Sequence, residues 1–422
     1  MLNVLLMRKE IVMKKMFLAW LLVAAFQRVW AQPLDSLRRM AFDANPTLKA
    51  LELEYEAALR KGDQVKYWPD TKLGVGVPMS RPETRLGGQV VLVSGSQFFP
   101  WKGTLRARED VVLTLARARY EQVLAEKLEV DYRVRTAYYN LYLVEAKQRV
   151  LRRHLRLYRA IESVSRAKVE SGTAIASDVL LVGAKIEELS YRLKILETDK
   201  VRYQARINEM LHREPHTPVT VYPDSLSLAS LDWDMAAFED KIRRNHPLVR
   251  ALEAKRQAAD KALALNDLEQ KPKFGVGVDY SIVTARRDAF PVHNGRDILI
   301  PKVMASVPLS HKRFRARAEE ERLLADAYAA RQEALVDRMM RELETYRAEY
   351  ERARLEYELA QRQLDVTKPA YDVLLAEYSS KNHRFEDLMN LQNQMINYEL
   401  QADVAMVRTY LIKAKLARLT DF

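Results

Sequence analysis

The sequence contains no cysteine. Disulfide bonds, thiolate metal sites, a cysteine nucleophile and a lipid-modified N-terminal cysteine are therefore excluded. Glycine and proline are also scarce, with 12 and 15 residues in a chain of 422, which favours long uninterrupted elements over a loop-rich fold. Beyond the N-terminal region, no stretch approaches the ~20 consecutive apolar residues that a transmembrane helix requires.

Residues 1–31 have the layout of a secretory signal peptide. Lys14 and Lys15 precede the apolar run 16–26, which is too short to span a bilayer, and small or apolar residues lead up to Gln32. We therefore expect this segment to be removed on export from the cytoplasm. Its loss takes away five Lys/Arg and one Glu, so the net charge falls from +12 to +8. This mildly basic balance does not require a nucleic-acid partner.

The rest of the sequence is a tandem duplication. Shifted by 201 residues, TKLGVGV (71–77) falls on PKFGVGV (272–278) without a gap. Shifted by 209 residues, LRAR (105–108) falls on FRAR (314–317). The difference of eight residues indicates a longer loop in the second copy, around 284–297.

We expect the two copies at 33–211 and 234–422, joined by a linker at 212–233. Each copy is predicted to contain a short helix, a β-hairpin and two long coiled-coil helices. The predicted hairpins and coiled-coil segments are, in chain order, 71–99, 104–211, 272–309 and 313–420. Asn45-Pro46 and His246-Pro247 are expected to start or interrupt the short helices, because proline fits a first helical turn but not an interior.

The predicted strands have one apolar face. In the second copy large apolar residues alternate with small or polar ones, and they are Phe274, Val276, Val278, Tyr280 and Ile282. A period of two predicts a strand with two different faces. Four such strands cannot close a barrel, since small barrels need about eight. If the strands lie in a bilayer, several copies of the chain must therefore pool them.

Apolar residues recur every seven positions in the long segments, as coiled-coil packing requires. The first segment shows the pattern at Ala116, Val123, Val130, Ala137, Val144, Leu151 and Tyr158, and its counterpart at Ala329, Val336, Leu343, Tyr350, Tyr357, Leu364 and Tyr371. The helix over 104–170 would be on the order of 100 Å long at ~1.5 Å per residue. The fold class predicted from these patterns is mainly α with a small β part.

The order of these features resembles the TolC-like outer-membrane efflux proteins. The resemblance covers essentially the whole chain after the signal peptide. It rests on the duplicated order together with Asn45-Pro46, His246-Pro247, SQFFPWKGTLRAR (96–108), VESGTAIASDVL (169–180) and YSSKNHRFEDLM (378–389). The segment PETRLGGQ (82–89) is similar to segments of the metal-exporting branch in Bacteroidetes-type bacteria.

The resemblance implies a homotrimer with a twelve-stranded β-barrel in the outer membrane, continuous with a periplasmic tunnel of α-helices. It implies a passive conduit that exports small molecules or metal ions, such as drugs or toxic metals. The partners implied are a periplasmic adaptor, an inner-membrane pump of RND type and outer-membrane lipid. No enzymatic activity, cofactor or metal site is implied.

The resemblance also places an aperture at the periplasmic end of the tunnel. A tyrosine and a basic residue of the second copy are expected to bond an aspartate of the first copy in a latch, and two further positions correspond to acidic rings. By position these residues are Tyr378, His383 with Arg384 beside it, Asp178, Asp387 and Asn390. Asn390 departs from the acidic pattern. An alternative role for Asp178 is stabilisation of the N-terminus of a helix in whose first turn it lies.

The helix-hairpin turns are expected to contact the adaptor. They present Ser171, Gly172, Thr173, Ser380, Lys381 and Asn382. Small side chains there would permit close docking, although the same residues are typical of any turn.

Other classes of function remain as alternatives. The seven histidines form no H-E-x-x-H motif and no G-x-S-x-G is present, which argues against common hydrolases. The main alternative is a soluble periplasmic coiled-coil scaffold or adaptor whose strands form a small domain. A conduit for type I protein secretion would share the architecture of an efflux channel.

Overall fold

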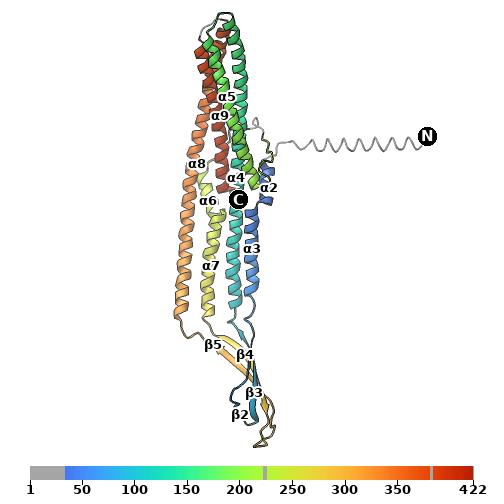
Figure 1. Ribbon diagram of the computed structural model, residues 1–422. Helices are drawn as coiled ribbons and strands as arrows, with labels where there is room; N and C mark the ends of the chain where they lie inside the picture. The colour runs from blue at the N-terminus through green and yellow to red at the C-terminus, as the bar shows by residue number, and fades with distance from the viewer. Residues whose placement is uncertain (1–33, 222–225, 381–383, 422) are drawn as a thin grey trace, which may run out of the picture. The chain divides into compact units, whose positions relative to one another are not determined.

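A computed structural model describes residues 34–221, 226–380 and 384–421 (Figure 1). The predicted signal peptide lies outside these residues. The elements, in chain order, are α2 (Leu34–Ala44), α3 (Pro46–Val65), β1 (Lys72–Gly76), β2 (Glu83–Thr84), β3 (Gly87–Phe99), α4 (Thr104–Glu170), α5 (Ala176–Met210), α6 (Met235–Asn245), α7 (Pro247–Glu269), β4 (Lys273–Thr284), β5 (Ile298–Ser306), α8 (Lys312–Ser380) and α9 (Phe385–Thr420). Apart from the two-residue strand β2, both halves of the chain follow one order of elements, as the predicted duplication requires.

Proline starts the second helix in each half. α3 begins at Pro46 and α7 at Pro247, where the missing N–H of proline costs no helical hydrogen bond. His246 caps α7, because its Nδ1 accepts a hydrogen bond from the backbone N–H of Leu248 at 3.2 Å. The short helix expected in each copy is therefore two helices separated by one residue.

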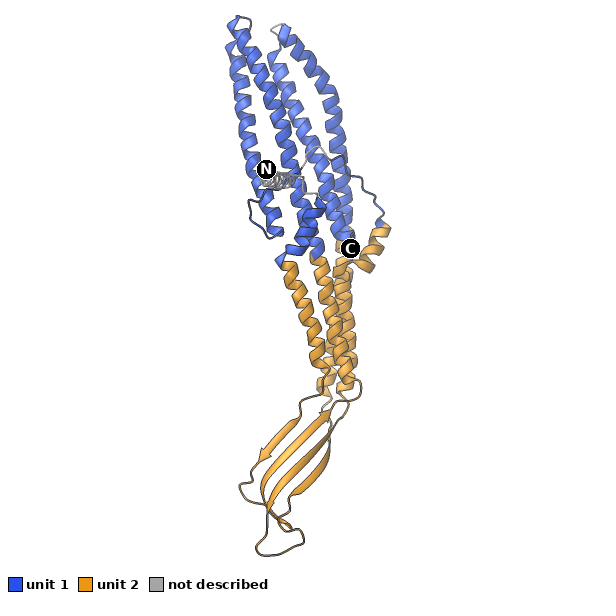
Figure 2. Ribbon diagram, turned by 90° about the vertical axis from the view of Figure 1, so that its right-hand side faces the viewer, with its two compact units in different colours: residues 1–46, 127–235, 341–421 blue, residues 47–126, 236–340, 422 orange. Residues whose placement is uncertain are grey.

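The chain forms two compact units, and each unit takes segments from both copies (Figure 2). Unit 1 consists of residues 1–46, 127–235 and 341–421, and unit 2 of residues 47–126 and 236–340 together with residue 422. The sequence repeats and the compact units are thus different divisions of the chain. The reason is that α4 and α8 are long enough to take part in both units.

The core of unit 1 lies between the helix pair α4 and α5 and the helix pair α8 and α9. Buried side chains from all four helices meet there, and they include Leu151, Tyr158, Val182, Leu189, Tyr371, Tyr378, Leu388 and Ile396. The heptad positions predicted on α4 are all buried, from Ala116 to Tyr158. On α8 the prediction is less complete, because Ala329 is exposed and Tyr357 and Leu364 are only half-buried in the single chain.

In unit 2 the helices α3, α7 and parts of α4 and α8 lie beside one another, with the sheet at one end (Figure 2). α7 buries a face of small residues, which are Ala251, Ala254, Ala258, Ala259 and Ala262. Alanines at this spacing let neighbouring helices approach closely. Lys261 Nζ donates to Thr114 Oγ1 at 2.7 Å, and Asn266 Nδ2 donates to the carbonyl of Phe314 at 3.0 Å. These bonds tie α7 to α4 and α8.

The strands form one antiparallel sheet in the order β1-β3-β4-β5, with the two-residue strand β2 beside β3. The central pair, β3 and β4, joins the first copy to the second, with Phe99 opposite Phe274 and Val93 opposite Tyr280. The two predicted hairpins are the outer pairs, β1 with β3 and β4 with β5. β1 and β5 are the edges of this sheet.

Across the described residues, no helix is long and apolar enough to cross a membrane.

Candidate functional site

The sheet has two chemically different faces. Residues opposite each other in an antiparallel pair share a face, so the registers place Leu73, Val75, Val93, Phe99, Phe274, Val276, Val278, Tyr280, Leu299 and Val303 on one face. Most of these side chains are exposed, and Val303 is 87% exposed. The other face carries the polar and small residues Lys72, Gly74, Ser94, Ser96, Gly275, Gly277, Asp279, Ser281 and Lys302, and interspersed with them the apolar residues Leu92, Phe98, Ile298, Ile300 and Met304. We call them the apolar face and the polar face.

The glycines of β4 make room on the polar face. A Cβ at Gly275 would lie 2.9 Å from the ring of Phe98, and one at Gly277 would lie 2.9 Å from the carbonyl oxygen of Gly95. The ring of Phe98 therefore lies over a glycine, and a larger residue there would displace it. Beside them Lys302 and Asp279 form an ion pair at 2.5 Å. The repeated Gly-Val pattern thus places glycines on one face of the strand and valines on the other.

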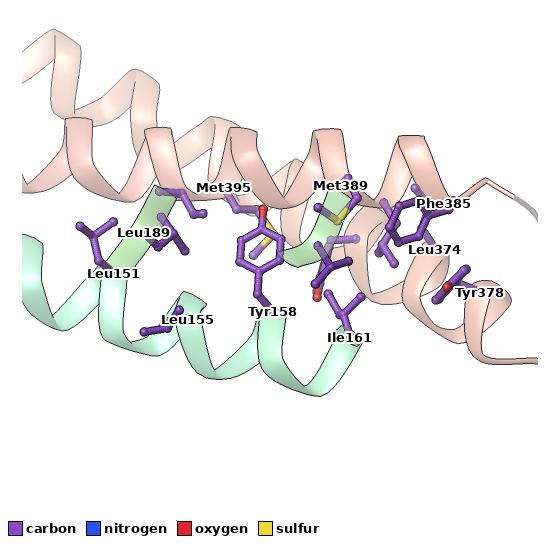
Figure 3. Close-up of a cluster of buried hydrophobic side chains, with 14 residues drawn as sticks. Leu151, Leu155, Tyr158, Ile161, Leu189, Leu374, Tyr378, Phe385, Met389 and Met395 are labelled. Carbon is purple, nitrogen blue, oxygen red and sulfur yellow. The ribbon is translucent and has the colours of Figure 1, made fainter. Parts of the chain in front are cut away.

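The tip of unit 1 holds the predicted aperture residue Tyr378 in a buried position (Figure 3). Its hydroxyl and Ser165 Oγ are 2.8 Å apart and share a hydrogen bond. The ring lies 5.3 Å from that of Phe385, and Lys168 Nζ lies 4.9 Å from its centroid. Burial raises the pKa of the Tyr378 hydroxyl. Tyr378 therefore ties α8 to α4 close to both helix turns.

Within one chain, no direct bond joins Asp178 and Arg384, and each of them has other neighbours. Asp178 lies in the first turn of α5 and is 7% exposed, and burial, followed by the nearby Glu386, raises the pKa of its carboxyl group. Arg384 precedes α9 with φ 69°, and its Nε donates to Asp387 Oδ2 at 2.9 Å. His383 lies outside the described residues. Within one chain, then, Arg384 pairs with Asp387.

α9 presents an exposed face of uncharged amides. Asn390, Gln394, Asn397 and Gln401 follow one another at helical spacing, and all four are exposed. Asp387 lies three residues before Asn390 on the same side of the helix. Asn390 thus begins a run of neutral polar side chains along this face.

The turn between α4 and α5 is closed by its own hydrogen bonds. Gly172 adopts φ 73°, Ser171 Oγ and Thr173 Oγ1 lie 2.9 Å apart, and Thr173 N–H donates to the carbonyl of Lys168 at 2.8 Å. All three turn residues are exposed. Ser380 ends α8 and is exposed too, whereas Lys381 and Asn382 lie outside the described residues.

Sequence reasoning missed a buried polar cluster between α4 and α9. His154 is 1% exposed, its Nε2 lies 2.8 Å from Glu399 Oε2, and its Nδ1 lies 2.5 Å from Gln392 Nε2. Burial pushes the pKa of Glu399 upward, but His154 and Arg153 outweigh it and hold the pKa below its usual value. Asp403, one turn further on, has its pKa raised to about 6 by burial. The sequence signal that could have indicated this cluster is the spacing of His154. It lies three residues after the heptad residue Leu151, where a coiled coil has its second buried position.

Within the described ranges, no three or more His, Asp or Glu side chains are grouped so that they could hold a metal ion.

Comparison with solved structures identifies the fold. The chain is similar to the outer-membrane channel OprN with TM-score 0.74 and 16% identity, over 92% of this chain and 89% of that one. It is similar to the outer membrane protein VceC of Vibrio cholerae with TM-score 0.72 and 13% identity, over 93% and 97% of the two chains. It is also similar to the open state of the MtrE outer membrane channel of Neisseria gonorrhoeae with TM-score 0.71 and 16% identity, over 92% and 88%.

The chain therefore has the fold of the TolC-like outer-membrane efflux channels, and the resemblance seen in the sequence is confirmed at the level of the fold. No protein-family model matches the sequence, and no curated protein matches it significantly.

Proposed function

We propose that this protein is an outer-membrane conduit that exports small molecules or metal ions, and that the exported chain works as a homotrimer. The observation that carries the proposal is the two-faced sheet. An exposed face without charged residues suits lipid, and the opposite face, on which apolar residues are interspersed with Gly, Ser and a Lys–Asp ion pair, suits contact with water. β3 and β4, with 13 and 12 residues, have the length that a tilted membrane-spanning strand needs.

The free edges of the sheet support assembly from several chains. In lipid, the unpaired N–H and C=O groups of β1 and β5 would each cost several kcal/mol. If the β1 edge of one chain pairs with the β5 edge of the next, the backbone N–H and C=O groups of both edges form hydrogen bonds. Three chains that each contribute β1, β3, β4 and β5 give the twelve strands of the barrel that the resemblance implies.

An uncovered heptad stripe in unit 1 supports the same assembly. Leu359, Val366 and Val373 on α8 are seven residues apart and are 57%, 74% and 59% exposed. α5 exposes Leu181 and Ile195, two heptads apart. Such stripes favour burial against helices of another chain. In the trimer, α9 and its amide face would line the water-filled tunnel.

We propose that the tip residues act in the assembled trimer. Asp178 with His383 or Arg384 of the aperture forms the latch, with Tyr378, Asp387 and Asn390 around it. The turns containing Ser171, Gly172, Thr173 and 380–382 receive the periplasmic adaptor, which links the conduit to an inner-membrane pump of RND type. A protein that serves such a system lies in the outer membrane.

The first experiment is membrane fractionation followed by native mass measurement in detergent. We expect a trimer of processed chains in the outer membrane. A soluble monomer or dimer in the periplasm would overturn the proposal and leave the coiled-coil scaffold. A trimer that supports only protein secretion with a type I pump would keep the conduit and change its cargo.

A matched pair of variants tests the orientation of the sheet. Val276→Lys puts a charge on the apolar face, at an expected cost of up to about 2–4 kcal/mol per chain, the upper range being the cost at the bilayer midplane. Ser94→Lys puts the same charge on the polar face. We expect the first variant to lose outer-membrane trimer and the second to keep it. Equal trimer yields from the two variants would contradict the assignment of the faces.

A further inference from the structure

Unit 2 contains a cationic cavity at the junction of its helices with the sheet. The cavity has a volume of about 320 Å³, and its lining residues are Arg108 of α4, Glu269 of α7, Lys273 of β4, and Arg313, Phe314 and Arg317 of α8. Four cationic side chains and one carboxylate give it a formal net charge of +3. The volume is in the range of small-ligand pockets.

The duplication of the chain explains the excess of positive charge. Arg108 and Arg317 are equivalent under the shift of 209 residues, so the repeat supplies this arginine twice. Both bind one carboxylate, since Arg108 Nη2 lies 2.6 Å from Glu269 Oε1 and Arg317 Nη1 lies 2.8 Å from Oε2. Under the shift of 201 residues, Glu269 corresponds to Trp68. The first copy therefore supplies no second carboxylate.

The two remaining cations are uncompensated. Burial pushes the pKa of Glu269 upward, but the arginines outweigh it and hold the pKa below its usual value, so this carboxylate is ionised and engaged by both arginines. Within the part of the chain that the structure describes, neither Lys273 nor Arg313 has an ion-pair partner. The Arg313 guanidinium lies over the ring of Phe314, 4.5 Å from its centroid.

Helix stability does not account for these cations. Arg108 lies near the start of α4, and Arg313 and Arg317 lie in the first turns of α8. The N-terminal end of a helix carries partial positive charge, so cations there are unfavourable. Glu269 offsets Arg108 and Arg317, so the cost in stability falls on Arg313, and a cation kept there without a partner points to a ligand.

Lys273 places the cavity on the water side of the sheet. Its register partner is Ser306, and it shares the polar face with Gly275 and Gly277, two and four residues along β4. An ion moving along the polar face would reach this cavity without entering lipid.

We propose that the cavity binds the phosphate or carboxylate group of an anionic solute that passes along the polar face. Guanidinium and ammonium groups donate charge-assisted hydrogen bonds to such oxyanions, and arginine does so in a bidentate manner. The identity of the ligand as a passing solute rests on the proposed conduit function. A lipid headgroup offers the same phosphate chemistry, and the experiment distinguishes the two sources.

The test is calorimetric titration of the full chain, purified in a neutral detergent at low salt, with inorganic pyrophosphate as the probe. Lys273→Gln with Arg313→Gln removes the two uncompensated cations and leaves the bonds to Glu269 in place. We expect binding at least about ten-fold weaker in this double variant, since each charge-assisted bond contributes roughly that factor. Glu269→Gln removes the competing carboxylate and should strengthen binding.

Arg315→Gln is the matched control, because it removes an exposed cation from the same turns of α8 but not from the cavity. We expect it to bind pyrophosphate as the unaltered chain does. Equal affinities for the unaltered chain and the double variant, or no binding to either, would overturn the proposal. So would retention of phosphatidylglycerol, but not pyrophosphate, that depends on Lys273 and Arg313.

Conductance in bilayers of neutral lipid separates this proposal from the conduit function. If the chain conducts but does not bind pyrophosphate, the cavity assignment fails and the conduit stands. If it binds pyrophosphate through Lys273 and Arg313 but does not conduct, the oxyanion site is supported. The conduit function is then wrong, and so is the assignment of a transported solute as the ligand.

Discussion

Replacing Asp403 by asparagine should stabilise the protein above pH 6. The carboxyl group lies among buried residues of α9, and its Oδ2 accepts no hydrogen bond from any residue that the structure describes. Burial raises the pKa to about 6 from the ordinary value of 3.8, although Arg149 opposes the shift. The ionised carboxylate is therefore less stable in the folded chain than in the unfolded chain.

The sign of the pH dependence follows from linkage. Below about pH 3.8 the carboxyl group is protonated in both the folded and the unfolded chain, and it costs no stability. Between 3.8 and 6 only the unfolded chain ionises, so stability falls as the pH rises. Above 6 the full penalty is present, and the pKa difference corresponds to about 3 kcal/mol per chain.

The assay is thermal unfolding followed by the helical circular dichroism signal, with the purified protein in one detergent at pH 4.5 and pH 8. Asp403→Asn should raise the free energy of unfolding at pH 8 by up to about 3 kcal/mol, and Tm by roughly 3–4 °C. At pH 4.5 the gain should be much smaller. Asp365→Asn, at an exposed position of α8, is the control and should change Tm little at either pH. A gain of equal size at both pH values would refute the reasoning.

Three further predictions concern the sheet and the tip. Gly275→Val should reduce the yield of folded trimer, because the added Cβ would lie 2.9 Å from the ring of Phe98. Gly76→Val is the control and should not reduce it, because no atom lies within 4 Å of the added Cβ. Heat-modified gel mobility of the trimer would show the difference. Tyr378→Phe should lower the free energy of unfolding by about 1–2 kcal/mol, because it leaves a buried serine hydroxyl without its partner; similar denaturation midpoints for variant and unaltered chain would contradict this. Asp178→Lys should raise single-channel conductance in bilayers if the latch holds the aperture closed. Unchanged conductance would contradict the latch hypothesis.

The periodic parts of the fold could be predicted because their signal is local and repeated. The seven-residue spacing on α4 predicted buried positions from Ala116 to Tyr158, and all seven of these residues are buried. The alternation in 274–282 gives the apolar face of β4 in the same way. Pro46 and Pro247 marked helix starts, since proline at a first turn has a direct steric reason.

The tip and the cavity depend on contacts between segments far apart in the chain. Ser165 bonds Tyr378 across 213 residues, and no local pattern indicates that pair. Whether Asp178 reaches a basic residue of another chain is still a prediction, and His383 lies outside the described residues. The expected aperture was located by resemblance, and its surroundings in one chain came only from the structure.

The sequence by itself determined the duplication, the helix and strand periods and the two faces of each strand, because these follow from the steric and hydrophobic preferences of neighbouring residues. Only the tertiary structure decided that β3 pairs with β4 between the copies, that His154 is buried against Glu399, and that Arg108 and Arg317 converge on Glu269. Such contacts depend on how whole helices and strands pack, and the packing balances the burial of all side chains at once.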